Sequence, residues 1–182
     1  MSKKILVLTG SSRKGGNSDL LADAFTKGAE SAGHTMTRFE CGHKNIQPCR
    51  ACDACYSKGS ACVFNDDFNE LVPLFLDSDM IVFVTPLYWY SFPSALKAAI
   101  DKLYSLIIGG KECPIQEAML LACGEISEER VFDGLRKSYE LILEDRGWTD
   151  FGQLIAPGVN KTGDILKTDF LEKAEQMGRA IK

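Results

Sequence analysis

The sequence predicts an α/β fold in which helices cover both faces of an open parallel sheet. Two observations support this expectation. Unbroken apolar runs such as KILVLTG (residues 4–10) and DMIVFVT (residues 79–85) are typical of strands buried on both faces. These runs alternate along the chain with longer segments whose apolar residues recur at helical spacing. Strands that alternate with helices favour a doubly wound parallel sheet with right-handed crossovers.

In the first half of the chain, a helix is expected to begin near Ser18. The apolar residues that follow recur at helical spacing, and Gly33 lies just past the expected end. The segment His34–Glu40 alternates only weakly, so we expect a more exposed strand there. Asp66 can cap the next helix, which is expected to extend over residues 66–78.

In the second half, Ser94–Ile108 is expected to be one helix, because its apolar residues form a single stripe. Ala118–Cys123 and Phe151–Pro157 are predicted to be the last two strands, and Glu128–Arg146 the helix between them. The closing helix is expected to take its apolar face from Leu166, Phe170, Leu171, Ala174 and Met177.

One long connection stands out from this pattern. No helix or strand is predicted between Cys41 and Asn65, although structureless loops of that length are uncommon in compact domains unless they are functional or disordered. The chain shows no internal repeat, low-complexity tract or linker. We therefore expect residues 1–182 to form a single domain with a cysteine-rich loop at residues 41–65.

The composition excludes several classes of protein. Of the 182 residues, 45% are hydrophobic and 25% charged, which is typical of globular proteins, and the net charge of −4 gives no basic surface for nucleic acid or an anionic membrane. The apolar run after Lys3 and Lys4 is too short for a signal peptide or a membrane span. We expect a cytoplasmic protein, in which thiols stay reduced.

The loop after the first strand has the character of an anion site. TGSSRKGGNS (residues 9–18) is rich in glycine and hydroxyl residues and precedes a helix, whose N-terminal N–H groups favour an anion. Ser11, Ser12, Asn17 and Ser18 could donate to phosphate oxygens, and Arg13 could pair with phosphate through two hydrogen bonds. The loop has neither the GxGxxG pattern nor a Walker A ending. A flexible turn without a ligand remains the alternative.

A second loop gathers aromatic residues where the third strand ends. Tyr88, Trp89, Tyr90 and Phe92 could stack against a flat heteroaromatic ring. Some of them could instead cover the following helix or form a subunit contact, and we expect one of these roles for Tyr90 or Phe92. After the fourth strand, the small residues Ala122–Gly124 would let a ring approach the backbone.

The cysteine-rich loop holds four thiols in a tight pattern. Cys49, Cys52, Cys55 and Cys62 follow the spacing C-x2-C-x2-C-x6-C. Such local spacing suits a [4Fe–4S] cluster with four cysteine ligands, whereas structural zinc sites usually use two separated C-x2-C pairs. We favour the cluster, and zinc, free thiols and disulfides remain open. A cluster would indicate one-electron transfer, because such a cluster accepts one electron at a time.

The other chemically active residues have no predicted role. Cys41, Cys113 and Cys123 are interpreted as ordinary buried or half-buried thiols, and His34 and His43 have no partners in the sequence that suggest catalysis. The sequence contains no Ser-His-Asp arrangement and no pair of catalytic carboxylates. We therefore predict no catalytic side chain and assign the chemistry to a cofactor.

Three segments resemble known motifs. GSSRKGGNS resembles the G-S-x-R-x-x-G-N-S/T loop of the flavodoxin-like NADPH-dependent FMN reductases, and TPLYWYSFPSALKAAIDK resembles their flavin-contacting segment. CRACDACYSKGSACVFNDDF resembles the compact cysteine motif of the iron–sulfur flavoproteins, one branch of this family. The resemblance covers nearly the whole chain.

The resemblance implies a flavodoxin-like sheet of order 2-1-3-4-5 and FMN as cofactor. The FMN phosphate would be bound by Ser11, Ser12, Arg13, Asn17 and Ser18. One side of the flavin ring would contact Pro86, Leu87, Tyr88 and Trp89, and the other side Cys123 and Gly124. The metal ligands would be Cys49, Cys52, Cys55 and Cys62. NAD(P)H or ferredoxin would be the electron donor, and a quinone, flavin or other small molecule the acceptor. The family also implies a homodimer or homotetramer.

Overall fold

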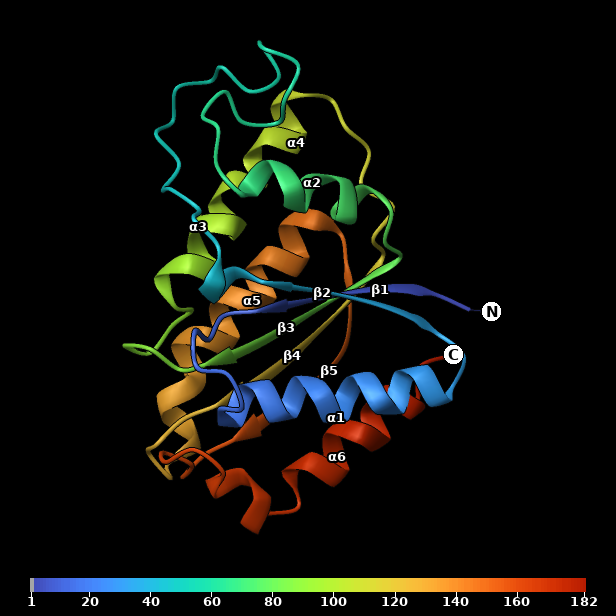
Figure 1. Ribbon diagram of the computed structural model, residues 1–182, viewed down its shortest axis with the longest axis vertical. Helices are drawn as coiled ribbons and strands as arrows, with labels where there is room; N and C mark the ends of the chain where they lie inside the picture. The colour runs from blue at the N-terminus through green and yellow to red at the C-terminus, as the bar shows by residue number, and fades with distance from the viewer. Residues whose placement is uncertain (1) are drawn as a thin grey trace.

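The sheet has five parallel strands in the order β2-β1-β3-β4-β5 in the computed structural model, which describes residues 2–182 (Figure 1). Met1, the first residue of the expected domain, lies outside the described residues. The flavodoxin-like fold and its strand order, predicted from the sequence, are confirmed. The strands are β1 (Lys4–Thr9), β2 (Thr35–Glu40), β3 (Met80–Pro86), β4 (Glu117–Cys123) and β5 (Thr149–Ala156).

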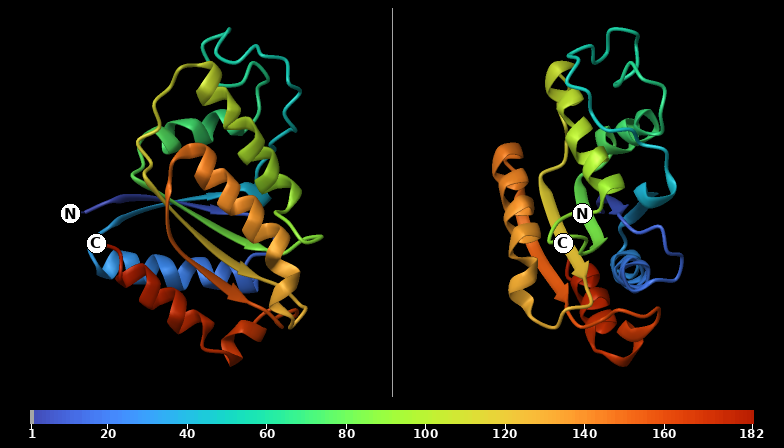
Figure 2. Two further views of the ribbon diagram at one scale, coloured as in Figure 1. Left: turned by 180° about the vertical axis from the view of Figure 1, so that it is seen from behind. Right: turned by 90° about the vertical axis from the view of Figure 1, so that its left-hand side faces the viewer.

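Helices cover the two faces of this sheet (Figures 1 and 2). They are α1 (Asn17–Ser31), α2 (Phe68–Leu76), α3 (Ser94–Lys102), α4 (Tyr104–Ile108), α5 (Asp133–Arg146) and α6 (Phe170–Arg179). Helices α1 and α6 pack on one face, and α2, α3 and α5 on the other, each over its own apolar core. The two cores are separate because successive side chains of each strand point to opposite faces.

The helix expected over Ser94–Ile108 is interrupted, which corrects the sequence prediction. The N–H of Leu103 donates to the carbonyl of Ile100, and the N–H of Leu106 donates to the carbonyl of Leu103. These bonds span three residues instead of four, so the chain tightens to a 3-10 turn between α3 and α4. The apolar stripe continues through the turn, and the spacing of apolar residues therefore did not reveal it.

Short 3-10 turns also change the ends of two other helices. Glu129–Phe132 forms such a turn, so α5 begins at Asp133 instead of Glu128. Leu166 lies in the turn Asp164–Lys167 and is 64% exposed, so it does not belong to the apolar face of α6. The cysteine-rich loop, for which no element was expected, begins with a 3-10 turn at Cys41–His43.

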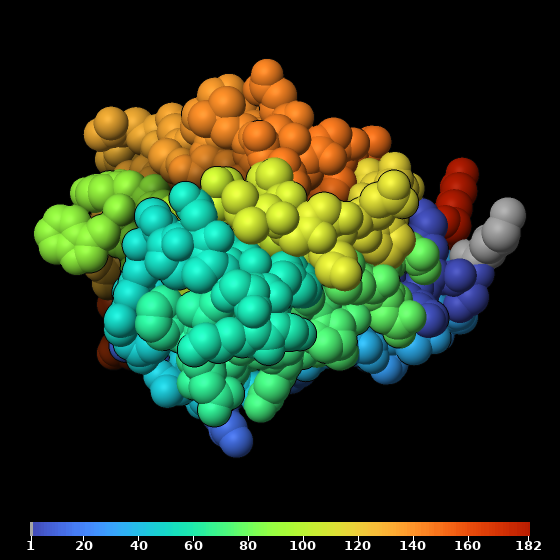
Figure 3. Space-filling model, turned by 90° about the horizontal axis from the view of Figure 1, so that it is seen from above, coloured from blue at the N-terminus to red at the C-terminus, as the bar shows by residue number. Residues whose placement is uncertain are grey.

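The fold places the interesting loops in two regions. The loops after β1, β3 and β4 follow the carboxyl ends of adjacent strands and therefore meet at one edge of the sheet. The part of the cysteine-rich loop that carries Cys49, Cys52, Cys55 and Cys62 lies away from this edge, over α2 and beside α4 (Figures 1 and 3). No helix within residues 2–182 is long and apolar enough to cross a membrane.

Candidate functional site

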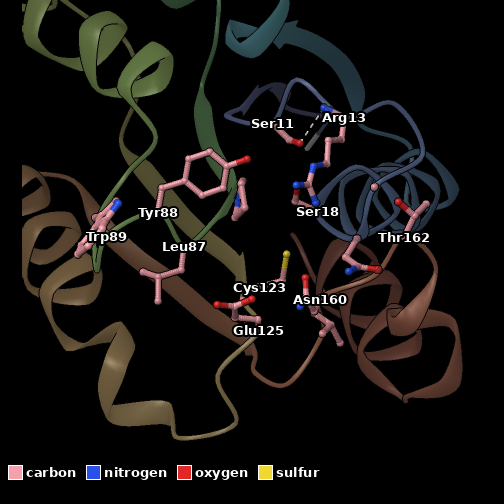
Figure 4. Close-up of a pocket in the computed structure, with 15 residues that line it drawn as sticks. Ser11, Arg13, Ser18, Leu87, Tyr88, Trp89, Cys123, Glu125, Asn160 and Thr162 are labelled. Carbon is pink, nitrogen blue, oxygen red and sulfur yellow. Dashed lines mark hydrogen bonds between the residues drawn. The ribbon is translucent and has the colours of Figure 1, made fainter.

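A cavity of about 410 Å³ opens at the carboxyl ends of β1, β3 and β4. This volume is typical of small-molecule and cofactor sites. The residues that line it are Ser11, Arg13, Gly16, Asn17, Ser18, Pro86, Leu87, Tyr88, Trp89, Cys123, Gly124, Glu125, Val159, Asn160 and Thr162 (Figure 4). The structure thus brings together every flavin-binding residue predicted from the sequence except Ser12, which is exposed and does not line the cavity.

The loop after β1 presents donors to this cavity. The hydroxyl of Ser11 accepts the backbone N–H of Arg13 at 3.0 Å, and the guanidinium of Arg13 points towards Ser18 (Figure 4). Helix α1 begins at Asn17, and its first intrahelical bond is donated by Leu20 to the carbonyl of Gly16. The N–H groups before Leu20 in the first turn have no helical acceptor, which leaves them available to an anion.

Asn17 joins the loop after β1 to the loop after β5. Its Nδ2 donates to the carbonyl of Lys161 at 3.0 Å, and its Oδ1 accepts the N–H of Ile165 at 3.3 Å. One N–H of the amide therefore remains for a ligand. Asn17 is only 8% exposed, so its two hydrogen bonds hold the loops together from within the protein.

The beginning of the cysteine-rich loop packs directly against the loop after β1. A Cβ atom at Gly42 would lie 2.3 Å from the carbonyl oxygen of Ser11 and 2.7 Å from the backbone nitrogen of Ser12. Only glycine fits such a close approach of two backbones. The two loops are therefore in direct contact, although they are far apart in the sequence.

The aromatic turn is a tight two-residue hairpin. Tyr88 and Ser91 exchange two backbone hydrogen bonds of 3.1 and 3.0 Å, and Trp89 and Tyr90 between them have φ angles of 45° and 64°. Both angles lie in the left-handed region, which costs an L-residue roughly 1–2 kcal/mol. Trp89 is 92% exposed and lies at the margin of the cavity, whereas Tyr88 lies nearer its centre (Figure 4).

The end of β4 completes the opposite wall. The N–H of Leu87 donates to the carbonyl of Cys123 at 2.7 Å, which joins the aromatic turn to this strand. Burial raises the pKa of the Cys123 thiol to about 12, and a hydrogen bond from Ser18 offsets this only in part. Cys123 therefore stays a neutral, apolar wall residue at physiological pH, as expected from the sequence.

The loop after β5 supplies wall residues that sequence reasoning missed, namely Val159, Asn160 and Thr162. The carboxylate of Asp164 accepts the N–H groups of Asn160 and Lys161, which fixes the loop beside the cavity. The segment GVNKTGD directly follows a strand whose carboxyl end lies at the same edge of the sheet. That position was the available signal, because ligands of such sheets bind at these ends. Gly16 and Glu125 were also missed.

A second, small pocket gathers the four cysteines of the C-x2-C-x2-C-x6-C pattern. It encloses about 20 Å³, and its walls come from the loop and from α3 and α4. The lining residues are Pro48, Cys49, Arg50, Ala51, Cys52, Asp53, Cys55, Cys62, Val63, Phe64, Lys102, Tyr104 and Ser105. Burial, and then the neighbouring thiols of Cys52, Cys62 and Cys49, raise the pKa of Cys55. In this arrangement no group of three or more His, Cys, Asp or Glu side chains among residues 2–182 is placed to hold a metal ion, and all seven cysteines are unpaired.

Two aspartates join the two ends of the cysteine-rich loop. The carboxylate of Asp66 accepts the N–H of Gln47 at 2.9 Å and a hydrogen bond from the buried ammonium of Lys102. Asp67 accepts the N–H of Asn45 at 2.8 Å and donates its own N–H to the carbonyl of Asn45. The two ends of the loop are therefore held together by hydrogen bonds within the protein.

The centre of the loop is held much less firmly. No backbone N–H from Cys49 to Cys55 donates to an acceptor in the part of the chain that the structure describes. Ala51, Asp53 and Tyr56 have φ angles of 48°, 49° and 60°, in the left-handed region. At about 1–2 kcal/mol each, these conformations are unfavourable unless something else stabilises them.

Comparison with known proteins places these sites in context. A protein of Archaeoglobus fulgidus named iron–sulfur flavoprotein is 33% identical over 100 residues, which cover 55% of this chain and 45% of that protein. YwqN of Bacillus subtilis, provisionally named as an NAD(P)H-dependent FMN-containing oxidoreductase, is 26% identical over 171 residues and 90% of each chain. The chain thus spans about half the length of the Archaeoglobus relative.

Solved structures agree with the fold. An NAD(P)H:quinone oxidoreductase from Methanothermobacter marburgensis superposes with a TM-score of 0.76 at 22% identity, over 98% of this chain and 96% of that one. The azoreductase AzrA superposes with a TM-score of 0.74 at 18% identity, over 98% of this chain and all of that one. Residues 3–125, which include the loop after β1, the cysteine-rich loop and the aromatic turn, match the NADPH-dependent FMN reductase family, and the chain belongs to that family.

Proposed function

We propose that this protein is an FMN-dependent oxidoreductase that takes electrons from NAD(P)H or a reduced ferredoxin and passes them to a quinone, a flavin or another small acceptor. The observation that carries the proposal is the 410 Å³ cavity, in which an anion loop and an aromatic turn face each other. A phosphate and a flat ring in one ligand fit these two walls. The names of the relatives support the same class of reaction.

Each wall has its own task in this proposal. Arg13 and the N–H groups at the start of α1 bind the FMN phosphate, with Ser11, Asn17 and Ser18 as further donors; Ser12, which does not line the cavity, has no role here. One side of the ring system contacts Pro86, Leu87, Tyr88 and Trp89, and the other side contacts Cys123 and Gly124. FMN, when bound, would supply hydride and one-electron chemistry. The protein residues position the ring and exclude water from it, and none is assigned as a catalytic acid or base.

We propose further that Cys49, Cys52, Cys55 and Cys62 hold a [4Fe–4S] cluster. Four thiols in one pocket provide the ligands that such clusters use. The pocket as it stands has room for about one water molecule, so the loop must open to admit a cluster. Within residues 2–182 no backbone N–H from Cys49 to Cys55 has an acceptor, so this movement breaks few hydrogen bonds. The names of several relatives support the assignment.

Helix α3 connects the two sites. It begins directly after the aromatic turn and ends at Lys102, which lines the cysteine pocket. Its nine residues span about 13 Å at 1.5 Å per residue, and the two sites share no lining residue. The two cofactors would therefore exchange electrons over a distance and would not touch within one chain.

We also propose that the protein is a homodimer or homotetramer. The Trp89 side chain is almost fully exposed on a backbone that is strained to present it. A large aromatic ring held out in this way is typical of the centre of a protein interface. A partner subunit would cover the ring and also narrow the opening of the flavin cavity, which Trp89 borders.

The decisive experiment is the visible spectrum of anaerobically purified protein, combined with iron and sulfide analysis and steady-state turnover with NADPH and a quinone. Flavin absorption, iron with sulfide, and turnover would support the full proposal. Flavin and cluster without turnover would indicate a redox carrier or sensor instead of an enzyme. Zinc, or no metal with flavin present, would leave a flavin reductase without a cluster. A colourless protein would contradict the flavin assignment.

A further inference from the structure

Ser105 carries a buried hydroxyl group without a partner. The residue is 3% exposed, and its Oγ atom makes no hydrogen bond to any residue from 2 to 182. A helical serine often donates to the carbonyl one turn earlier, as Ser138 does to Gly134 at 2.9 Å. Ser105, which follows the 3-10 turn between α3 and α4, does not. A buried, unpaired hydroxyl is unfavourable, so its presence points to an acceptor that the protein chain does not provide.

Lys102 is a second buried donor with unused hydrogens. The residue is 4% exposed, and its ammonium group has three N–H bonds but one hydrogen-bonding acceptor among the described residues, the carboxylate of Asp66. The Phe68 ring, whose centroid lies 5.5 Å from Nζ, adds a weaker contact. An ammonium buried in this way needs further negative charge or acceptors nearby.

Both donors line the pocket of the four cysteines. The thiols come from the loop, whereas Ser105 and Lys102 come from the helical side of the same pocket. The pocket therefore brings together a hydroxyl and a cation, both with unused hydrogens, and the four thiols proposed as ligands. Hydrogen bonds to ligand and inorganic sulfur are one of the main ways in which a protein sets the reduction potential of an iron–sulfur cluster.

We propose that Ser105 and Lys102 donate hydrogen bonds to the sulfur atoms of the cluster in this pocket and raise its reduction potential. The inference rests on the cluster assignment made above. When one electron arrives from the reduced flavin, the negative charge in the pocket increases by one. Ser105 and Lys102 keep their protons, and no bond is formed or broken. Donors that are already in place stabilise the added charge and so favour the reduced form.

The test is a redox titration of the anaerobically purified holoprotein, followed by visible and electron paramagnetic resonance spectroscopy. Ser105→Ala removes the hydroxyl and little else. Its reduction equilibrium should become at least tenfold less favourable, which corresponds to a midpoint potential about 59 mV lower for one electron. Ser105→Thr retains the hydroxyl and should titrate like the wild type. Ser138→Ala, a matched helical serine outside the pocket, should leave the potential unchanged.

Lys102 is tested together with its partner, because Lys102→Met alone would leave the Asp66 carboxylate buried without its cation. The double variant Lys102→Met/Asp66→Asn should lower the potential at least as much as Ser105→Ala, at unchanged iron and sulfide content. Lys97→Met, on the exposed side of the same helix, is its control and should have no effect.

The outcomes separate this inference from the proposal on which it rests. Wild-type protein without iron and sulfide would overturn both. A wild-type cluster whose potential is the same in Ser105→Ala would overturn this inference alone and would mean that a water molecule satisfies Ser105. Loss of the cluster in Ser105→Ala but not in Ser105→Thr would support a role for the hydroxyl, whereas loss in both would show that only the packing matters.

Discussion

Replacing Asn17 tests how the flavin cavity is held together. In Asn17→Ala, the buried N–H of Ile165 loses its acceptor, which costs about 1–3 kcal/mol, and the hydrogen bond to the Lys161 carbonyl, worth about 0.5–1.5 kcal/mol, is also lost. We expect the free energy of unfolding to fall by roughly 2–4 kcal/mol. For a protein of this size that corresponds to a melting temperature lower by about 5–15 °C.

The assay combines urea denaturation of the flavin-free protein with an FMN titration. Asn17→Ala should also bind FMN more weakly, because the loop that carries Asn160 and Thr162 would no longer be fixed beside the cavity. Asn17→Asp is the informative companion. Its carboxylate can still accept the N–H of Ile165, so part of the stability should return, yet it would repel the phosphate and weaken FMN binding further.

Two results would refute this reasoning. If Asn17→Ala unfolds at the same urea concentration as the wild type, the hydrogen bonds of Asn17 do not hold the two loops together. If Asn17→Asp binds FMN as tightly as the wild type, Asn17 does not lie beside the phosphate. Ser138→Ala, which removes one exposed hydrogen bond within α5, controls for the general effect of losing a side-chain contact.

The remaining predictions concern single features of the two sites. Arg13→Ala should weaken FMN binding by about 1.5–3 kcal/mol in a fluorescence titration, through loss of a charge-assisted pair, and unchanged affinity would remove Arg13 from the site. Trp89→Ala should shift the oligomer towards monomer in light scattering, and a wild type that is already monomeric at micromolar concentration would contradict the proposed assembly. Because the pKa of Cys123 is raised to about 12, its thiol should stay protonated and resist iodoacetamide at pH 8, and labelling as fast as the exposed Cys49 would contradict this. Removing the metal should accelerate hydrogen exchange from Cys49 to Cys55 and leave the strands unchanged, and equal protection in both forms would show that packing holds the loop.

Most of the fold was predictable because the relevant signals are local. Buried parallel strands appear as unbroken apolar runs such as Ile81–Val84, and the loops that follow them must meet at one edge. The interruption at Leu103 was not predictable, because the stripe of apolar residues continues through it. The left-handed turn at Trp89 and Tyr90 was also missed, since turns of this kind favour asparagine and glycine, and neither occurs there.

The parts of the site that sequence reasoning missed depend on contacts between distant segments. Asn17 was expected to face a phosphate, and nothing in the sequence indicates that its amide also holds the loop at Lys161. Nothing in the sequence distinguishes Gly42 from other loop glycines, yet it is the point at which the cysteine-rich loop contacts Ser11. Such pairs become neighbours only when the sheet has formed, and no spacing rule along the chain encodes them.

The hydrogen bonds of the cysteine-rich loop show which part of it the proposed cluster would have to order. Ordering a residue costs about 1–2 kcal/mol in backbone entropy, so a loop with few apolar contacts is poorly ordered on its own. Asp66 and Asp67 already fix both ends, and Asn69 holds Cys62 by accepting its N–H at 2.8 Å. What remains is the stretch Cys49–Cys55, which carries three of the four proposed ligands and two of the left-handed residues. Binding of the proposed cluster would therefore have to order only this short stretch, because Asn69 already holds Cys62, the proposed fourth ligand.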